Sequence, residues 1–113
     1  MYRIPNDFDI SSAVGQCATQ ICIGQYDLQF TVGEVHFSVW STILLRKQGI
    51  EVGQWREDSW PNEAFFQVLN VNLARYEVVD ERQLVLYFEN GMEMVLTDSS
   101  DQHESMQIGW YII

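Results

Sequence analysis

Residues 83–97 read QLVLYFENGMEMVLT and carry the clearest folding signal in the chain. Apolar residues recur at every second position on both sides of a central Asn90–Gly91 pair. This alternation is typical of a β-strand with one buried face, and Asn–Gly favours the positive backbone angles of a tight turn. The stretch therefore predicts a β-hairpin.

A second hairpin is predicted over residues 26–40, YDLQFTVGEVHFSVW, with its turn at Gly33. A further strand precedes each hairpin, over residues 16–23 in the first half and 71–79 in the second. Before each of those strands lies a short segment of helical character. The second segment, SWPNEAFFQVLN, has a proline and a glutamate in its first turn, as helix N-termini often do.

These elements predict a single domain over residues 1–113 of the α+β class, mainly antiparallel β. We expect about seven strands in two meander units, with one or two short helices. Aligning Val14 with Leu69 and Gly33 with Gly91 suggests a tandem helix–strand–strand–strand repeat, although any two meanders share such alternation. The predicted core consists of Ile21, Ile23, Leu28, Phe30, Phe37, Phe65, Leu69, Leu84, Leu86, Phe88, Met94 and Leu96.

The charge of the chain is strongly acidic, with a formal net charge of −10. Residues 1–57 contribute −2 and residues 58–113 contribute −8. A negative field of this size repels phosphate backbones, so we expect no nucleic-acid binding. A basic protein partner and a solvated surface that aids solubility are both compatible with it.

The two cysteines, Cys17 and Cys22, are expected to remain unpaired. Five residues of extended chain separate them by roughly 16 Å and place them on opposite faces. Lone thiols indicate a reducing compartment, and the sequence shows neither a signal peptide nor a membrane span, so a cytoplasmic location is predicted.

Strong catalytic motifs are missing from the sequence. It has no glycine-rich phosphate loop, nucleophile elbow or zinc-ligand spacing, so we expect no cofactor and no metal. His36 alternates onto the strand face opposite Val35 and Phe37, where it is either a general base or an exposed strand histidine.

The stretch LTDSSDQHES, residues 96–105, gathers polar groups between two predicted strands. Its candidate binding residues are Asp98, Asp101, His103 and Glu104. It lacks the glycine and ligand order of a calcium loop, and it matches no recognised catalytic spacing. Asp and Ser also bond their own backbone in turns, so a structural bend is the leading interpretation.

Large aromatic residues mark two further candidate surfaces. Trp55 and Trp60 flank a charged loop, either as a recognition surface or as a loop folded over the core. The terminal stretch IGWYII reads as an apolar edge strand, and we expect a homodimer through Ile108, Trp110 and Ile112.

The sequence also resembles a known group of proteins. Residues 1–30 and the stretch LVLYFENGMEMVLTDSSDQHESMQI are similar to a family of small bacterial hypothetical proteins of unknown function, some of them similar to integron gene-cassette products. His103 departs from that pattern, which has an aromatic residue there, and this argues against a catalytic histidine. The resemblance implies a fold and no mechanism.

Two functions follow as hypotheses. The first is a non-catalytic binding or interaction module that neutralises a basic partner, for which acidic complementarity speeds the encounter. The second is a small-ligand protein or enzyme with a pocket between sheet and helix, served by His, Asp and Glu side chains.

Overall fold

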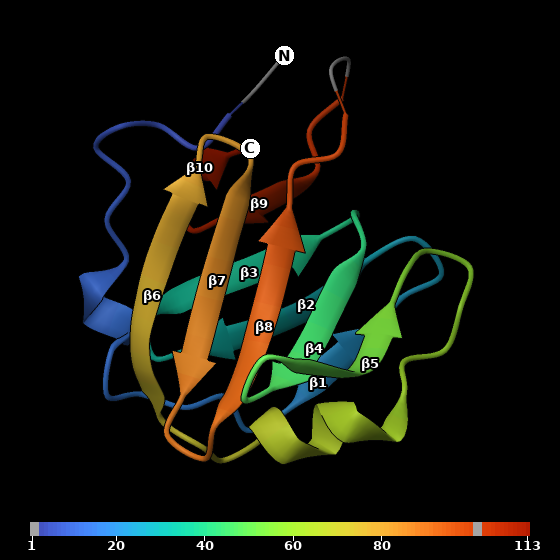
Figure 1. Cartoon of the computed structure of the whole chain (residues 1–113). Helices are drawn as coiled ribbons and strands as arrows, with labels where there is room; N and C mark the ends of the chain where they lie inside the picture. Colours follow the sequence, from blue (N-terminus) through green and yellow to red (C-terminus); the bar gives the residue numbers. More distant parts are fainter. Residues whose placement is uncertain (1–2, 101–102) are drawn as a thin grey trace.

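In the computed structural model, residues 3–100 and 103–113 form ten strands in two antiparallel sheets of five (Figure 1). The strands are β1 (Ile21–Ile23), β2 (Leu28–Val32), β3 (Val35–Val39), β4 (Ile43–Lys47), β5 (Ile50–Trp55), β6 (Leu73–Asp80), β7 (Gln83–Phe88), β8 (Met92–Thr97), β9 (Met106–Ile108) and β10 (Tyr111–Ile112). The first sheet has the order β1-β2-β3-β9-β10 and the second β5-β4-β8-β7-β6. The prediction of a mainly antiparallel β protein is confirmed.

The predicted number of strands was too low, and the helical part is smaller than expected. Residues 43–55 form a complete hairpin, β4–β5, and the tail divides into β9 and β10 at Gly109. In the described residues the helices are two 3-10 segments, η1 (Ser11–Ala13) and η2 (Glu63–Val68). The chain is therefore a two-sheet β structure more than an α+β one.

Both predicted hairpins form, β2–β3 and β7–β8, and most of the predicted core is buried. Three predicted core residues are not: Ile21 and Leu69 are half-buried, and Ile23 is exposed. The two isoleucines are incompletely buried because they belong to β1. This is the outermost strand of the first sheet and has a neighbour on one edge only.

The two halves of the chain exchange their last hairpins. Strands β1–β3 pair with β9–β10 from the second half, and strands β6–β8 pair with β4–β5 from the first. Matching contacts join the halves: Gly15 N–H donates to Leu73 O and Asn70 N–H donates to Ala18 O, both at 2.8 Å. The shift that aligns Val14 with Leu69 also relates these two bonds. Their agreement supports the predicted repeat, and a duplication of the sequence stays a prediction.

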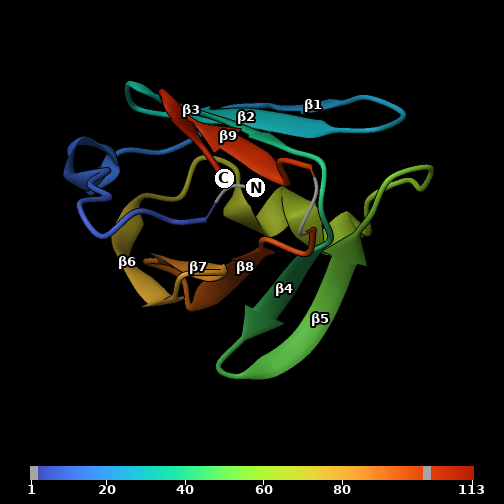
Figure 2. The same ribbon diagram turned by 90° about the horizontal axis from the view of Figure 1, so that it is seen from above.

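The two sheets pack face to face with their strands crossing, as Figure 2 shows from above. Their inner faces form one hydrophobic cluster. The N-terminal segment covers one end of this core, where Phe8 packs against Tyr76 of β6 and Tyr111 of β10 at ring distances of 6.1 and 4.7 Å. At the other end, η2 lies close to β5 and beside β1.

The turn glycines Gly33 and Gly91 give a matched test of the hairpins. Both have positive φ, +61° and +89°, so alanine at either position should cost about 1–2 kcal/mol of folding stability. At Gly33 an added Cβ would also lie 2.7 Å from Gln16 Cγ, whereas at Gly91 the nearest atom is 4.0 Å away. Urea unfolding should therefore show the larger loss for Gly33→Ala. Adding Gln16→Ala should reduce the excess, because it removes Cγ and leaves only Cβ at 3.0 Å, and an unchanged excess would contradict this explanation.

Candidate functional site

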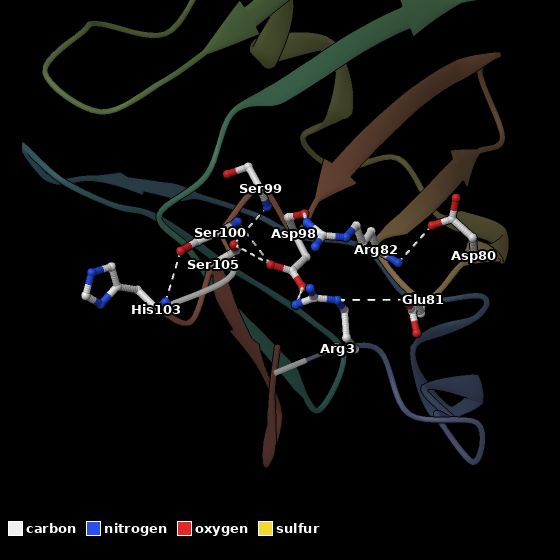
Figure 3. Close-up of polar contacts among 9 residues, drawn as sticks. All are labelled: Arg3, Asp80, Glu81, Arg82, Asp98, Ser99, Ser100, His103 and Ser105. Carbon is white, nitrogen blue, oxygen red and sulfur yellow. Dashed lines mark hydrogen bonds and ion pairs between the residues drawn. The ribbon is translucent and has the colours of Figure 1, made fainter. Parts of the chain in front are cut away.

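The carboxylate of Asp98 is the centre of a buried polar network at the end of β8 (Figure 3). Its side chain is fully buried, and Arg3 Nη1 lies 3.1 Å from its Oδ2. Ser105 Oγ donates to Asp98 Oδ1 at 2.9 Å and accepts from Ser99 N–H at 3.0 Å. Arg82 Nη1 donates to the carbonyl of Asp98 at 3.3 Å. Both carboxylate oxygens are therefore bound by the protein itself, which assigns Asp98 to structure.

The other candidates from this loop do not gather into a site. His103 and Glu104 are exposed, and the His103 backbone N–H donates to Ser100 Oγ at 2.9 Å. Asp101 lies outside the described residues. Among the residues that the structure describes, no group of three His, Cys, Asp or Glu side chains could hold a metal ion.

His36 lies on the outer face of the first sheet, as its alternation with Val35 and Phe37 predicts. Its Nδ1 is 2.7 Å from Thr31 Oγ1 and its Nε2 is 3.2 Å from Gln29 Oε1. Both ring nitrogens thus face neutral side chains. These two contacts hold the imidazole along the strand surface.

The two tryptophans that flank the charged loop have opposite environments. Trp55 ends β5 fully buried, opposite Ile43 of β4, whereas Trp60 is 79% exposed. A shared recognition surface is therefore wrong for Trp55. Alternation along β5 turns Gly53 and Trp55 toward the core, and the chain then reverses before it reaches Trp60.

The predicted dimer edge is likewise divided. Ile108 is fully buried opposite Phe37, so its assignment to an interface is wrong. Gly109 has a φ of +58° and turns the chain, which leaves Trp110 82% exposed and Ile112 partly exposed. Only these two of the three residues can reach a partner.

A mainly apolar groove lies between β1 and η2, and exposed aromatic residues border it. We call it the Trp60 groove; it has a volume of about 350 Å³. It is lined by Ile21, Ile23, Trp60, Pro61, Asn62, Glu63, Phe65, Phe66 and Leu69. Trp60 and Phe66 are 79% and 76% exposed, so two large aromatic side chains border it in water.

Phe66 had not been recognised from the sequence as a candidate. Phe65 and Phe66 are adjacent, and adjacent helical residues do not face the same way. Phe65 is buried in the core, so Phe66 has to point outward. The doubled phenylalanine was the available signal.

Acidic side chains lie in the Trp60 groove and in the hollows beside it. Trp60 also borders two adjoining hollows, one with Glu51 and Arg56 and the other with Asp58. Together with Glu63, three carboxylates and one guanidinium lie around this tryptophan. The groove therefore favours a cationic neighbour.

The outer face of the second sheet carries charges that are satisfied within the sheet. Arg46 Nε lies 3.0 Å from Glu93 Oε1, Tyr87 Oη donates to Glu77 Oε1 at 2.9 Å, and the Arg75 guanidinium stacks 3.7 Å from the Tyr87 ring centre. The bond to Glu77 and partial burial raise the pKa of Tyr87 above its ordinary 10.0. Because opposite charges pair here, this face presents less uncompensated charge to a partner than the Trp60 groove does.

Raising the pH tests this cluster. The folded protein holds the Tyr87 proton more tightly than the unfolded chain does, so this contribution to stability is present below pH 10 and is lost as the pH rises through the raised pKa. Urea unfolding between about pH 8 and pH 11 should show a decline that Tyr87→Phe reduces. The exposed Tyr26, changed to Phe, controls for the loss of one phenol. An unchanged decline in Tyr87→Phe would refute the assignment.

Comparisons with protein-family models, with curated proteins and with solved structures find no match to this chain. The resemblance to small bacterial proteins thus stays a prediction. In the described part of the chain, no helix has the length and apolar character needed to cross a membrane.

Proposed function

We propose that this chain is a small non-catalytic interaction module that binds a basic partner protein through the Trp60 groove. The observation that carries the proposal is the pair of exposed aromatic side chains, Trp60 and Phe66, beside an apolar hollow. Single exposed apolar residues are common, but contiguous ones around a hollow are typical of binding surfaces. Tryptophan is also the residue most enriched among the dominant contacts of interfaces.

The charge of the surroundings supports a basic partner. Carboxylates of Glu51, Asp58 and Glu63 outnumber the single guanidinium of Arg56 around Trp60. Such a rim accelerates encounter with a cation and makes the rate sensitive to salt. The unpaired Cys17 and Cys22 are in keeping with a cytoplasmic setting for this encounter.

Trp60 and Trp110 provide a matched test, because they are similarly exposed and lie in different loops, Trp60 between β5 and η2 and Trp110 between β9 and β10. A basic protein captured by the wild type should bind Trp60→Ala at least about tenfold more weakly, as expected for a central interface aromatic. Trp110→Ala should bind it normally. Calorimetry at low and high salt should show weaker binding at high salt. Equal losses in the two variants, or no effect of salt, would contradict the proposal.

A small apolar ligand is the second candidate, because the volume of the Trp60 groove, about 350 Å³, falls within the range of ligand pockets. The predicted acid–base residues His36, Asp98 and His103 are not among its lining residues, and Glu63 is the one carboxylate there. A ligand of this kind would bind without dependence on salt. A homodimer through Trp110 and Ile112 also stays a proposal, which light scattering of the wild type and Trp110→Ala addresses.

A further inference from the structure

Resting on the proposed function, we infer that the basic partner binds as an extended strand paired with the free edge of β1. This strand would become a sixth member of the first sheet, with apolar side chains in the Trp60 groove. Addition of a strand to an exposed sheet edge supplies affinity through backbone bonds and specificity through alternate side chains.

The backbone groups available on this edge follow from the hairpin geometry. Gly24 N–H donates to Asp27 O at 2.9 Å, so Gly24 faces β2. Successive residues of a strand direct these groups to opposite edges, which turns the N–H and C=O of Ile21 and Ile23 away from β2. Asp58 N–H reaches Gln25 O from that outer side at 2.7 Å, which agrees with this alternation.

The side chains of the same two residues lie along the Trp60 groove. Ile21 is opposite Phe30 and Ile23 is opposite Leu28, and both partners on β2 are buried in the core. Side chains directly opposite in a sheet share a face, so Ile21 and Ile23 point to the inner side. Residues of an added strand opposite them would therefore enter the groove, while intervening residues would lie beside Cys22 on the outer face.

The length of the open edge is set by two fixed points. At one end β1 begins at Ile21, and at the other Asp58 N–H is bonded to Gln25 O. Residues 21–24 lie between these points. A strand rises about 3.3 Å per residue, so a partner segment of about four to six residues fits this edge.

Charge selects the sequence of that segment. The Asp58 carboxylate belongs to the residue that bonds Gln25 O at one end of the edge, and the Glu63 carboxylate lines the groove itself. A second copy of this chain would bring the same carboxylates together and repel itself. We therefore assign the edge to a segment whose apolar residues at alternate positions enter the groove and whose ends carry lysine or arginine.

The test uses a synthetic capped peptide of six residues with leucine at two alternate positions and lysine at both ends. At saturation, NMR hydrogen exchange of the Ile21 and Ile23 amides should slow at least tenfold, whereas the amides of Cys22 and Gly24, which already face β2, should change less than twofold. Methylating one alternate set of peptide amides should weaken binding at least tenfold, and methylating the other set should have little effect.

Three results would overturn the inference. Binding that requires Trp60 and Phe66 without slower exchange at Ile21 and Ile23 rejects strand pairing and leaves the proposed function standing. If the peptide does not bind, the strand inference is rejected. The proposed function is tested separately, by comparing how the captured partner binds the wild type and Trp60→Ala. Protection of both amides in a dimer of the free protein assigns the edge to a second copy instead.

Discussion

Replacing Trp55 by alanine should lower the free energy of unfolding by about 3–5 kcal/mol, the usual cost of removing a large aromatic side chain from a core. Trp55 is fully buried opposite Ile43, where the end of β5 meets β4. The change would leave a cavity that the surrounding strands cannot fill, because both belong to a paired sheet. Urea unfolding followed by circular dichroism measures the loss.

Trp60 is the matched control for this prediction. It lies five positions further along the chain but is 79% exposed, so Trp60→Ala should change stability by no more than about 0.5 kcal/mol. Similar losses in the two variants would contradict the assignment of one tryptophan to the core and the other to a binding surface. Trp55→Phe should fall between them, since it keeps a ring in the core.

Removing the Asp98 carboxylate is the second change with a large expected effect. Asp98→Ala should cost about 2–3 kcal/mol, because Ser105 and Arg3 lose a charged acceptor, while Arg3 is 20% exposed and keeps Glu81 at 4.0 Å. Arg3 Nη1 and Ser105 Oγ would both lose the acceptor that they now contact at 3.1 and 2.9 Å. The same change would remove the ion pair that joins Arg3 of the N-terminal segment to the loop that follows β8.

Asp80 is the control for Asp98. Its side chain also accepts a backbone bond, from Arg82 N–H at 2.8 Å, but the residue is exposed. Asp80→Ala should therefore cost less than about 1 kcal/mol in thermal or urea unfolding. If Asp98→Ala costs no more than Asp80→Ala, the network around Asp98 does not hold the loop.

Local patterns were sufficient to predict the two central hairpins. The turns at Gly33 and Gly91 and the alternation beside them depend on neighbouring residues, which a single sequence displays. Hairpin β4–β5 was less visible because its register shifts between Leu45 and Arg46, which interrupts the alternation. The exchange of hairpins between sheets is a long-range choice that no local pattern encodes.

The candidate site was predictable only in part. The polar loop at residues 96–105 was correctly suspected of being a connector, since Asp98 bonds Ser105 and Arg3. Trp60 was selected correctly as exposed and Trp55 was not, because a charged neighbourhood in sequence does not reveal which side of a strand faces water. The groove itself needs β1 and η2 side by side, and their contact is set by the tertiary structure.

The exchange of hairpins also determines how this chain can fold. Strands β1–β3 pair with β9 and β10, so the first sheet is complete only after residues 106–112 have been synthesised. Pairing between such distant segments raises the contact order, and chains of high contact order fold slowly. Until residues 106–112 emerge from the ribosome, the edge of β3 that pairs with β9 has no neighbour, and a chaperone that shields apolar strands would act during that interval.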